Sequence, residues 1–304
     1  MTAISDLLTK TRFGEPLISG SMFAVPLFAE TDVQEEFLTL DEAFAQKLVE
    51  VSETSEDGSV PELVVGNGAS QSVFLLDGEQ VLGLKQNRTF NLSMVLPPYQ
   101  TTVVPVSCLE RGRWSAQANL ASSAEHVHFA KGRAKRMELV SQNLRVFNSL
   151  RSDQGQVWAD IDEKFSAERE SCTSAEADFY AHRRSSIDND LARFAPQPHQ
   201  VGVIFGANSK VIGFDLFGSA YLFARLGPKL VRSYLLEADE YTGPASPPAK
   251  DQLMQAVSSL FGVKSQAFDA PGLGETHRWS NDAGNSAALI VDGKCVHAVG
   301  FCSR

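Results

Sequence analysis

A row of four polar residues follows an apolar stretch near position 80. In LLDGEQVLGLKQNRTFN, residues 75–91, the row consists of Lys85, Gln86, Asn87 and Arg88. A guanidinium that is even partly buried needs a carboxylate or an anionic ligand, because an unpaired buried charge is very costly. The row therefore has a physical reason to bind an anion. If the strand pairing changes at a bulge, all four side chains instead lie exposed at a strand end, and both interpretations stay open.

A second polar group follows the next apolar run, in SCLERGRWSAQAN. Glu110, Arg113 and Trp114 combine a carboxylate, a guanidinium fork and an aromatic ring, which together suit the phosphate and the ring of a ligand. We expect this strand end to lie beside the end of residues 80–88, so that both groups form one polar pocket with Glu79. Glu79 or Glu110 would then act as a general base or bind ribose hydroxyls. In the alternative interpretation, each is the ion-pair partner of a neighbouring arginine.

Other polar residues are candidates because of their places in predicted elements. Gln156 lies with Trp158 at the start of a predicted helix, where backbone N–H groups and the helix dipole favour an anion. Asp215, in GFDLFGS, ends a predicted strand just before a helix, where it could hold a functional carboxylate or tie the loop. His126 and His128 share one face of a predicted strand, but a third ligand at suitable spacing is missing, so we predict no metal site.

The segment PGLGETHRW, residues 271–279, is predicted to be a loop. Its glycines lack the strand-to-helix context of a dinucleotide fingerprint and the lysine of a P-loop. Glu275, His277 and Arg278 could close over a ligand from such a loop. No nucleophile-elbow motif supports Ser-His-Asp chemistry.

Composition narrows the class of protein. The chain has 304 residues, of which 43% are hydrophobic and 21% charged, as in a globular protein. No apolar run approaches the roughly 20 residues that span a bilayer, and the N-terminus lacks a secretory signal, so we expect a cytoplasmic protein without a membrane partner. Four cysteines at no zinc-ligand spacing predict reduced, mostly buried thiols.

Charge is unevenly distributed along the chain. The formal net charge of −10 argues against nucleic-acid binding. Residues 111–151, however, carry eight lysines and arginines against Glu125 and Glu138, a local charge of 8 − 2 = +6. This segment either attracts an anion or forms the solvated face of a basic helix.

Hairpins separated by helices predict the fold class. Asp77-Gly78 and Asp292-Gly293 are each predicted to be the two-residue turn of a β-hairpin. Capping signals and apolar periodicity predict helices at about 40–52, between about 131 and 195, at 219–237 and around Leu253. We expect Pro228 to kink or divide the third of these. The pattern predicts an α+β fold with antiparallel, hairpin-rich sheets packed against amphipathic helices, in a single composite domain over 1–304 with a flexible boundary near 240–250.

Four segments carry a resemblance to a known family. They are LLDGEQVLGLKQNRTFN, VVPVSCLERGRW, QGQVW at 154–158, and the stretch at 201–238 that begins VGVIFGANSK. The chain resembles the ARG and rhodanese-phosphatase-superfamily-associated protein domain family over most of its length. The resemblance implies a place in the metabolism of NAD-derived or ADP-ribosylated molecules, but no reaction, and no cofactor is indicated. The matching polar positions are Glu79, Lys85, Gln86, Asn87, Arg88, Glu110, Arg113, Trp114, Gln156, Trp158 and Asp215.

Three hypotheses for the function follow. In the first, which we favour, the protein is an enzyme acting on a phosphate-bearing, nucleotide-like small molecule, and Glu79 or Glu110 moves a proton. In the second, it is a non-catalytic module that binds ADP-ribose or a nucleotide. In the third, it is an adaptor that docks on an ADP-ribosylglycohydrolase through its basic 131–151 helix. A rhodanese-like phosphatase is the alternative partner. The predicted ligand-binding residues are Lys85, Gln86, Asn87, Arg88, Arg113, Trp114, Gln156 and Asp215.

Overall fold

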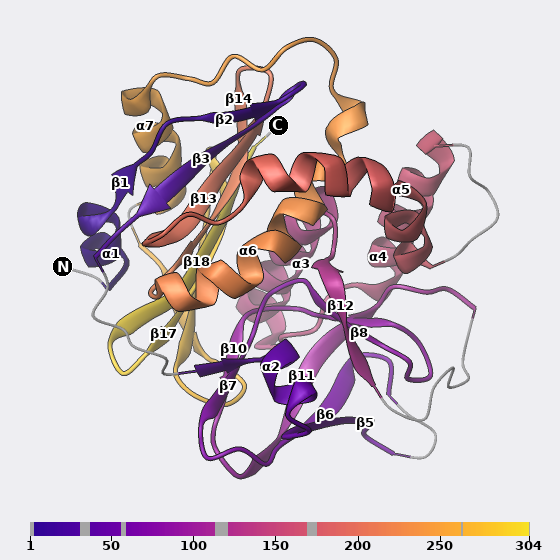
Figure 1. Ribbon diagram of the computed structural model, residues 1–304. Helices are drawn as coiled ribbons and strands as arrows, with labels where there is room; N and C mark the ends of the chain where they lie inside the picture. Colours follow the sequence, from indigo (N-terminus) through magenta and orange to yellow (C-terminus); the bar gives the residue numbers. More distant parts are fainter. Residues whose placement is uncertain are drawn as a thin grey trace. The chain divides into compact units, whose positions relative to one another are not determined.

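The computed structural model describes residues 3–30, 37–55, 59–112, 121–168, 175–262 and 264–303 (Figure 1). Contacts within the chain divide it into two compact units. Unit 1 comprises Met1–Glu36, Ser186–Ala270 and Gly274–Arg304, and unit 2 comprises Phe37–Ser185 and Pro271–Leu273. Both combine antiparallel strands with helices, so the predicted α+β class is confirmed. The single composite domain stays a prediction, and the stretch near 240–250 falls within the range of unit 1.

Unit 1 is built on a nine-stranded antiparallel sheet, in the order β1-β3-β13-β14-β18-β17-β16-β15 with β2 paired to β3. Its strands are β1 (Arg12–Phe13), β2 (Leu17–Ser19), β3 (Met22–Phe28), β13 (Gln200–Ala207), β14 (Lys210–Phe217), β15 (Gln266–Asp269), β16 (Glu275–Asn281), β17 (Gly284–Val291) and β18 (Lys294–Cys302). The hairpin predicted at Asp292-Gly293 is confirmed as β17–β18, and β13 and β14 form a second hairpin. The predicted loop at 271–279 is wrong from Glu275 onward, because those residues pair with both β15 and β17.

Helices cover both faces of this sheet. On one face, α1 (Ala3–Lys10) and α7 (Lys250–Leu260) bury Ile4 and Leu253 in a core shared with Ile204 of β13. On the other, α6 (Ala220–Leu235) stacks Tyr234 on Phe205 at 4.0 Å between ring centroids. The end of α5 (Glu176–Leu191), from Ser186, and two short helices, η1 (Ala192–Phe194) and η2 (Ala238–Glu240), complete unit 1. The expectation that Pro228 could divide α6 is wrong, because the helix continues through it.

Unit 2 contains a six-stranded sheet, in the order β12-β8-β9-β11-β6-β5, and a three-stranded sheet, in the order β10-β7-β4. Its strands are β4 (Phe37–Thr39), β5 (Val49–Glu53), β6 (Glu62–Asn67), β7 (Ser72–Leu75), β8 (Glu79–Leu82), β9 (Arg88–Phe90), β10 (Met94–Leu96), β11 (Gln100–Cys108) and β12 (Ser122–Val127). Its helices are α2 (Leu40–Ala45), α3 (Ala130–Phe147), α4 (Gln154–Glu168) and the first part of α5 (Glu176–Leu191). None of the described helices is both long and apolar enough to cross a membrane.

Two local predictions for unit 2 are wrong in their extent. The Thr39 capping box is present, but α2 ends at Ala45 and the chain returns as β5, because Val49 and Val51 alternate into the core of a sheet. The Asp77-Gly78 turn does not join a hairpin. Strand β7 before it pairs with β10 and β4, whereas β8 after it pairs with β9 and β12.

Candidate functional site

The strands β8, β9 and β11 of unit 2 carry polar side chains on both faces. Their register aligns Val81, Arg88 and Cys108 in one row across the strands. It aligns Gln80, Thr89 and Ser107 in the next row. Residues opposite each other in a sheet share a face, and successive residues alternate, so the two rows point to opposite sides. One side buries a single arginine, and the other side buries two.

Arg88 and Gln86 lie at one end of the first side, which also faces the apolar core of the unit. The Arg88 side chain is 0% exposed; its Nη1 donates to Gln86 Oε1 at 3.1 Å, and its Nη2 lies 3.7 Å from Glu53 Oε2. Glu53 ends β5 in phase with the buried Val49 and Val51, so its side chain continues the core row. We call Glu53, Gln86, Arg88 and Cys108 the strand-end cluster.

Of the two interpretations left open for the polar row, the structure supports burial for three of its four members. Gln86, Asn87 and Arg88 are buried, and Lys85 is half-buried with its backbone N–H 3.3 Å from Glu53 Oε1. The row is not a straight continuation of β8. β8 ends at Leu82, and the chain bends from Gly83, whose φ is +94°, before β9 begins at Arg88.

The expectation that the two strand ends lie together is confirmed. Arg88 pairs with Cys108 in the register of β9 and β11, and Leu109 N–H donates to the Asn87 carbonyl at 2.9 Å. Glu110 follows directly, is buried, and forms an isolated bridge with Ala175. Gly78 N–H donates to the Phe90 carbonyl, so Glu79 lies level with Phe90, near the opposite end of β9 from Arg88. The structure therefore brings Glu110, and not Glu79, to the end of the strands that holds Arg88.

Cys108 is a protonated core thiol at neutral pH. Burial raises its pKa from the ordinary 9.0 to about 11; the Arg88 guanidinium lowers it and the Glu53 carboxylate raises it. The free cysteines Cys108, Cys295 and Cys302 are buried or half-buried, as predicted, and Cys172 lies outside the described residues. The thiolate is the reactive form of cysteine, so this environment does not support Cys108 as a nucleophile.

Helix α4 borders the strand-end cluster with an amide and an indole. Gln154 accepts from Cys108 N–H at 2.8 Å and donates to the Cys108 carbonyl at 2.9 Å. Trp158 lies one turn later on the same helical face. The exposed Arg111 guanidinium lies 5.9 Å from the centre of its ring, and the buried indole Nε1 has no hydrogen-bond partner within the described part of the chain. The strand ends are thus lined by an aromatic ring and a cation.

The remaining predicted residues lie apart from the cluster or are not described. Gln156 is exposed; its Nε2 donates to Asp160, and its backbone N–H donates to Asp153, which occupies the place that an anion would take at this helix start. Asp215 belongs to unit 1, is fully buried in β14 and lies 3.3 Å from His297 Nε2. Glu79 accepts from Leu76 N–H at 3.1 Å. Arg113 and Trp114 lie outside the described residues.

The opposite side of the same strands holds a cluster that sequence reasoning missed. Asp77 lies 2.7 Å from Arg136 Nη2 and 3.4 Å from Arg133 Nη2, and all three side chains are buried. Arg136 also donates to Thr89 Oγ1 at 3.1 Å. Burial lowers the pKa of Arg136, while the Asp77 carboxylate opposes that change. We call these four residues the α3 cluster.

Two signals in the sequence could have revealed the α3 cluster. Arg133 and Arg136 are three residues apart, and they extend the buried stripe of Met137, Val140 and Leu144 along α3. The predicted solvated basic face, and with it the adaptor surface on this helix, is therefore wrong for these two arginines. Other basic residues of the segment do reach acidic partners at the surface, as Lys131 does with Glu163.

A buried histidine and glutamate adjoin the α3 cluster. His128 Nδ1 lies 2.5 Å from Glu176 Oε2, and the other oxygen of Glu176 accepts from Phe129 N–H at 3.1 Å. His126 stacks on Tyr180, with 3.5 Å between ring centroids. The two imidazoles thus have separate partners. Among the described residues no group of three or more His, Cys, Asp or Glu could hold a metal ion.

A family model described as the ARG and Rhodanese-Phosphatase-superfamily-associated Protein domain matches residues 10–301. The chain belongs to this family. The match covers residues of both units, so the strand-end cluster and the α3 cluster lie within the family domain. The family name records an association with two superfamilies, and the name gives no reaction. No curated protein and no solved structure matches the chain.

Proposed function

We propose that the protein is an enzyme acting on a phosphate-bearing, nucleotide-like small molecule in NAD- or ADP-ribose-related metabolism. The observation that carries the proposal is the register of β9 and β11, which lays Asn87 and Arg88 along Cys108 and Leu109. This register gathers guanidinium, carboxylate and amide groups at one end of the sheet. The family's recorded association with ADP-ribosylglycohydrolases supports this class of substrate.

Each group has a role in this proposal. Arg88 binds a phosphate oxygen pair through its fork, which requires the Gln86 amide or the Glu53 carboxylate to turn aside. Arg111 and Lys85, at the more exposed rim, attract the anion. Trp158 offers a ring face for a base, since aromatic side chains stack on planar ligands. Glu110 transfers the proton, and Arg113 and Trp114 remain further candidates for the phosphate and the ring.

A ligand screen tests the proposal. Thermal unfolding and mass spectrometry of the whole protein with ADP-ribose, NAD, ribose phosphates and cyclic derivatives should show a stabilising ligand and a new product. Stabilisation should fall in Arg88→Ala, and turnover should fall in Glu110→Gln. The matched control is Arg151→Ala, which removes an exposed arginine paired with Glu62. This variant should change neither the stabilisation by the ligand nor the turnover.

The outcomes separate the enzyme from a binding module. Product formation that depends on Glu110 supports catalysis. Stabilisation without any product would support the binding module in its place. Stabilisation unchanged in Arg88→Ala would remove Arg88 from the site, and turnover unchanged in Glu110→Gln would remove the proton-transfer role.

A further inference from the structure

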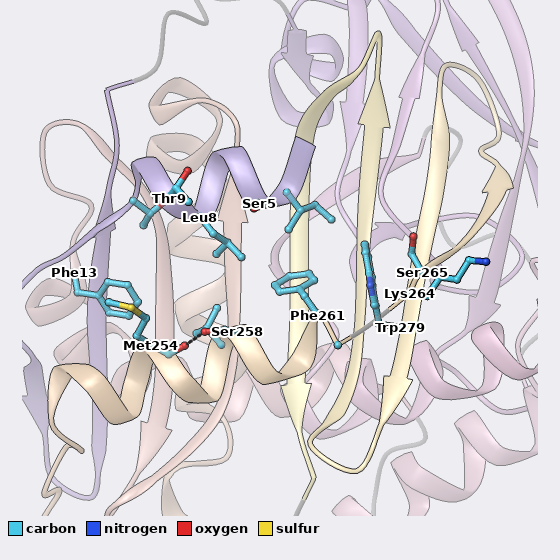
Figure 2. Close-up of a pocket in the computed structure, with 14 residues that line it drawn as sticks. Ser5, Leu8, Thr9, Phe13, Met254, Ser258, Phe261, Lys264, Ser265 and Trp279 are labelled. Carbon is cyan, nitrogen blue, oxygen red and sulfur yellow. Dashed lines mark hydrogen bonds between the residues drawn. The ribbon is translucent and has the colours of Figure 1, made fainter. Parts of the chain in front are cut away.

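Unit 1 contains a cleft between α1 and α7, with a cavity volume of about 670 Å³ (Figure 2). Phe13 and Met254 lie at one end, and Phe261 and Trp279 lie towards the other. Phe261 and Trp279 pack edge to face with their ring centroids 5.2 Å apart. A cavity of this size, lined by apolar side chains together with serine, threonine and lysine side chains, lies in the range of small-molecule sites.

The Trp279 end of this cleft carries a hydrogen-bonded chain of three polar side chains. Ser265, which lines the cleft, has its Oγ 3.1 Å from His277 Nδ1. His277 Nε2 lies 3.4 Å from Glu275 Oε2. One imidazole tautomer satisfies both contacts: Nδ1 accepts from the Ser265 hydroxyl, and the Nε2–H group donates to the carboxylate.

The strands of unit 1 fix this arrangement. Glu275, His277 and Trp279 alternate along β16 and so share one face. Ser265 directly precedes β15, whose first residue, Gln266, pairs with Arg278 of β16. The serine is thereby held beside the imidazole, although twelve residues separate them in the chain. The Trp279 indole on the same strand connects the three polar groups with the apolar cleft.

We propose that Ser265, His277 and Glu275 hydrolyse a carboxylic ester whose apolar acyl group occupies the cleft. A serine hydroxyl becomes a nucleophile when an oriented base accepts its proton, and a third group holds that base. Ser258, another serine in the cleft, lacks this setting because its hydroxyl donates to the Met254 carbonyl within α7. This proposal is independent of the strand-end cluster, which belongs to unit 2.

The reaction proceeds through an acyl-enzyme. Ser265 Oγ forms a bond to the ester carbonyl carbon while its proton passes to His277 Nδ1, and Glu275 stabilises the imidazolium. The ester C–O bond then breaks, and His277 returns the proton to the departing alcohol oxygen. Water then attacks the acyl carbon while His277 Nδ1 takes its proton. The bond between that carbon and Ser265 Oγ breaks, and His277 returns the proton to Oγ, which releases the carboxylic acid and restores the hydroxyl. Lys264, which precedes Ser265 and also lines the cleft, points away from the other lining residues (Figure 2), so it must turn toward the ester to supply positive charge for the oxyanion.

A fluorophosphonate probe and a series of p-nitrophenyl esters test the proposal on the whole protein. The probe should label Ser265 in the folded wild-type protein, as identified by peptide mass. Ester hydrolysis should rise with acyl length up to the capacity of the cleft. It should fall about a thousandfold in Ser265→Ala and similarly in His277→Gln, since the members of such a triad act as a unit. The control variant Ser259→Ala, which changes an exposed serine of α7 that does not line the cleft, should retain full rates.

Several results would overturn the proposal. These are no label on Ser265 in the folded protein, label on Ser258 instead, or hydrolysis unchanged in Ser265→Ala. An ester that binds and quenches the tryptophan fluorescence without being hydrolysed would show that the hydrogen bonds of Ser265, His277 and Glu275 only link β15 to β16. Because labelling needs no variant, a Ser265→Ala protein that fails to fold leaves the test intact.

Discussion

The strand-end cluster buries one arginine and the α3 cluster buries two, on opposite faces of β8, β9 and β11, and the distances from these arginines to their carboxylate partners differ. In the α3 cluster, Asp77 lies 2.7 Å and 3.4 Å from two guanidinium groups, and no residue of the cluster is more than slightly exposed. In the strand-end cluster, Arg88 lies 3.7 Å from Glu53, which is itself partly exposed, and donates to a neutral amide. Close ion pairs at fixed geometry suit a structural role, whereas a looser arrangement at a strand end can exchange partners for a ligand.

The largest expected effect is the loss of the carboxylate at the centre of the α3 cluster. Asp77→Asn leaves two buried guanidinium groups without their shared negative charge, and breaking a buried ion pair in this way costs about 3–5 kcal/mol. Chemical denaturation should show this drop in the free energy of unfolding. The control is Asp292→Asn, at the exposed turn of the β17–β18 hairpin, which should change it by less than about 0.5 kcal/mol. Equal effects of the two variants would refute the structural role of the α3 cluster.

A smaller loss of stability is expected from a substitution at the contact between α3 and His128. A Cβ atom added at Gly132 would lie 2.2 Å from His128 Nε2, and the Glu176 contact holds that ring in place. Gly132→Ala should therefore destabilise the protein by about 1–3 kcal/mol, although alanine ordinarily favours a helix.

The matched control for that variant is Gly155→Ala in α4. There the nearest atom, Asp153 Oδ1, would lie 3.2 Å from the added Cβ. Its free energy of unfolding should be unchanged or slightly raised. If Gly132→Ala proves as stable as Gly155→Ala, the packing around His128 is not as close as the structure indicates.

The thiol of the strand-end cluster provides a pH test. Because the pKa of Cys108 is raised from 9.0 to about 11 in the fold, its contribution to stability is present below about pH 9 and is lost as the pH rises through about 11. Iodoacetamide at pH 8 should alkylate Cys108 slowly in the folded protein and rapidly in denaturant. Glu53→Gln, which removes a charge that raises this pKa, should speed alkylation, and Arg88→Gln should slow it. The opposite order would contradict the placement of these charges around Cys108.

The two Asp-Gly turns illustrate how much of the fold the sequence could predict. Asp292 and Gly293 both have positive φ, at +49° and +73°, and this hairpin formed as its local signal indicates. At the other turn only Gly78 has a positive φ, of +88°. The Asp77 carboxylate there forms ion pairs with Arg133 and Arg136, and the Asp77 N–H donates to Ser93 Oγ. The same dipeptide thus has a different role, because the partners come from a helix more than fifty residues later. Apolar periodicity and capping signals predict local helices and strands, but they do not predict such long-range contacts.

The same limit applies to the candidate sites. The adjacency of the two strand ends was predicted, since neighbouring strand ends follow from an antiparallel sheet, whereas burial of Arg88 was one of two interpretations left open. The alternation of side chains along strand β8 does not continue past Gly83. The positive φ of this residue changes the direction of the chain, and with it the face to which the following side chains point. The chain of Ser265, His277 and Glu275 was not predicted, because β16 was taken for a loop and no short motif contains all three residues.

The most direct test of the strand-end cluster is the affinity for ADP-ribose, measured by isothermal titration calorimetry. The wild type, Arg88→Lys and the control Arg151→Lys should be compared under one ionic strength. Arg88→Lys keeps the charge but loses the two-pronged fork, so its Kd should rise about tenfold to a hundredfold, consistent with about 1.5–3 kcal/mol for a hydrogen bond to a charged group. Arg151→Lys should leave Kd unchanged. Equal Kd values for all three proteins, or no binding by the wild type, would contradict the assignment of Arg88 to a phosphate-binding site.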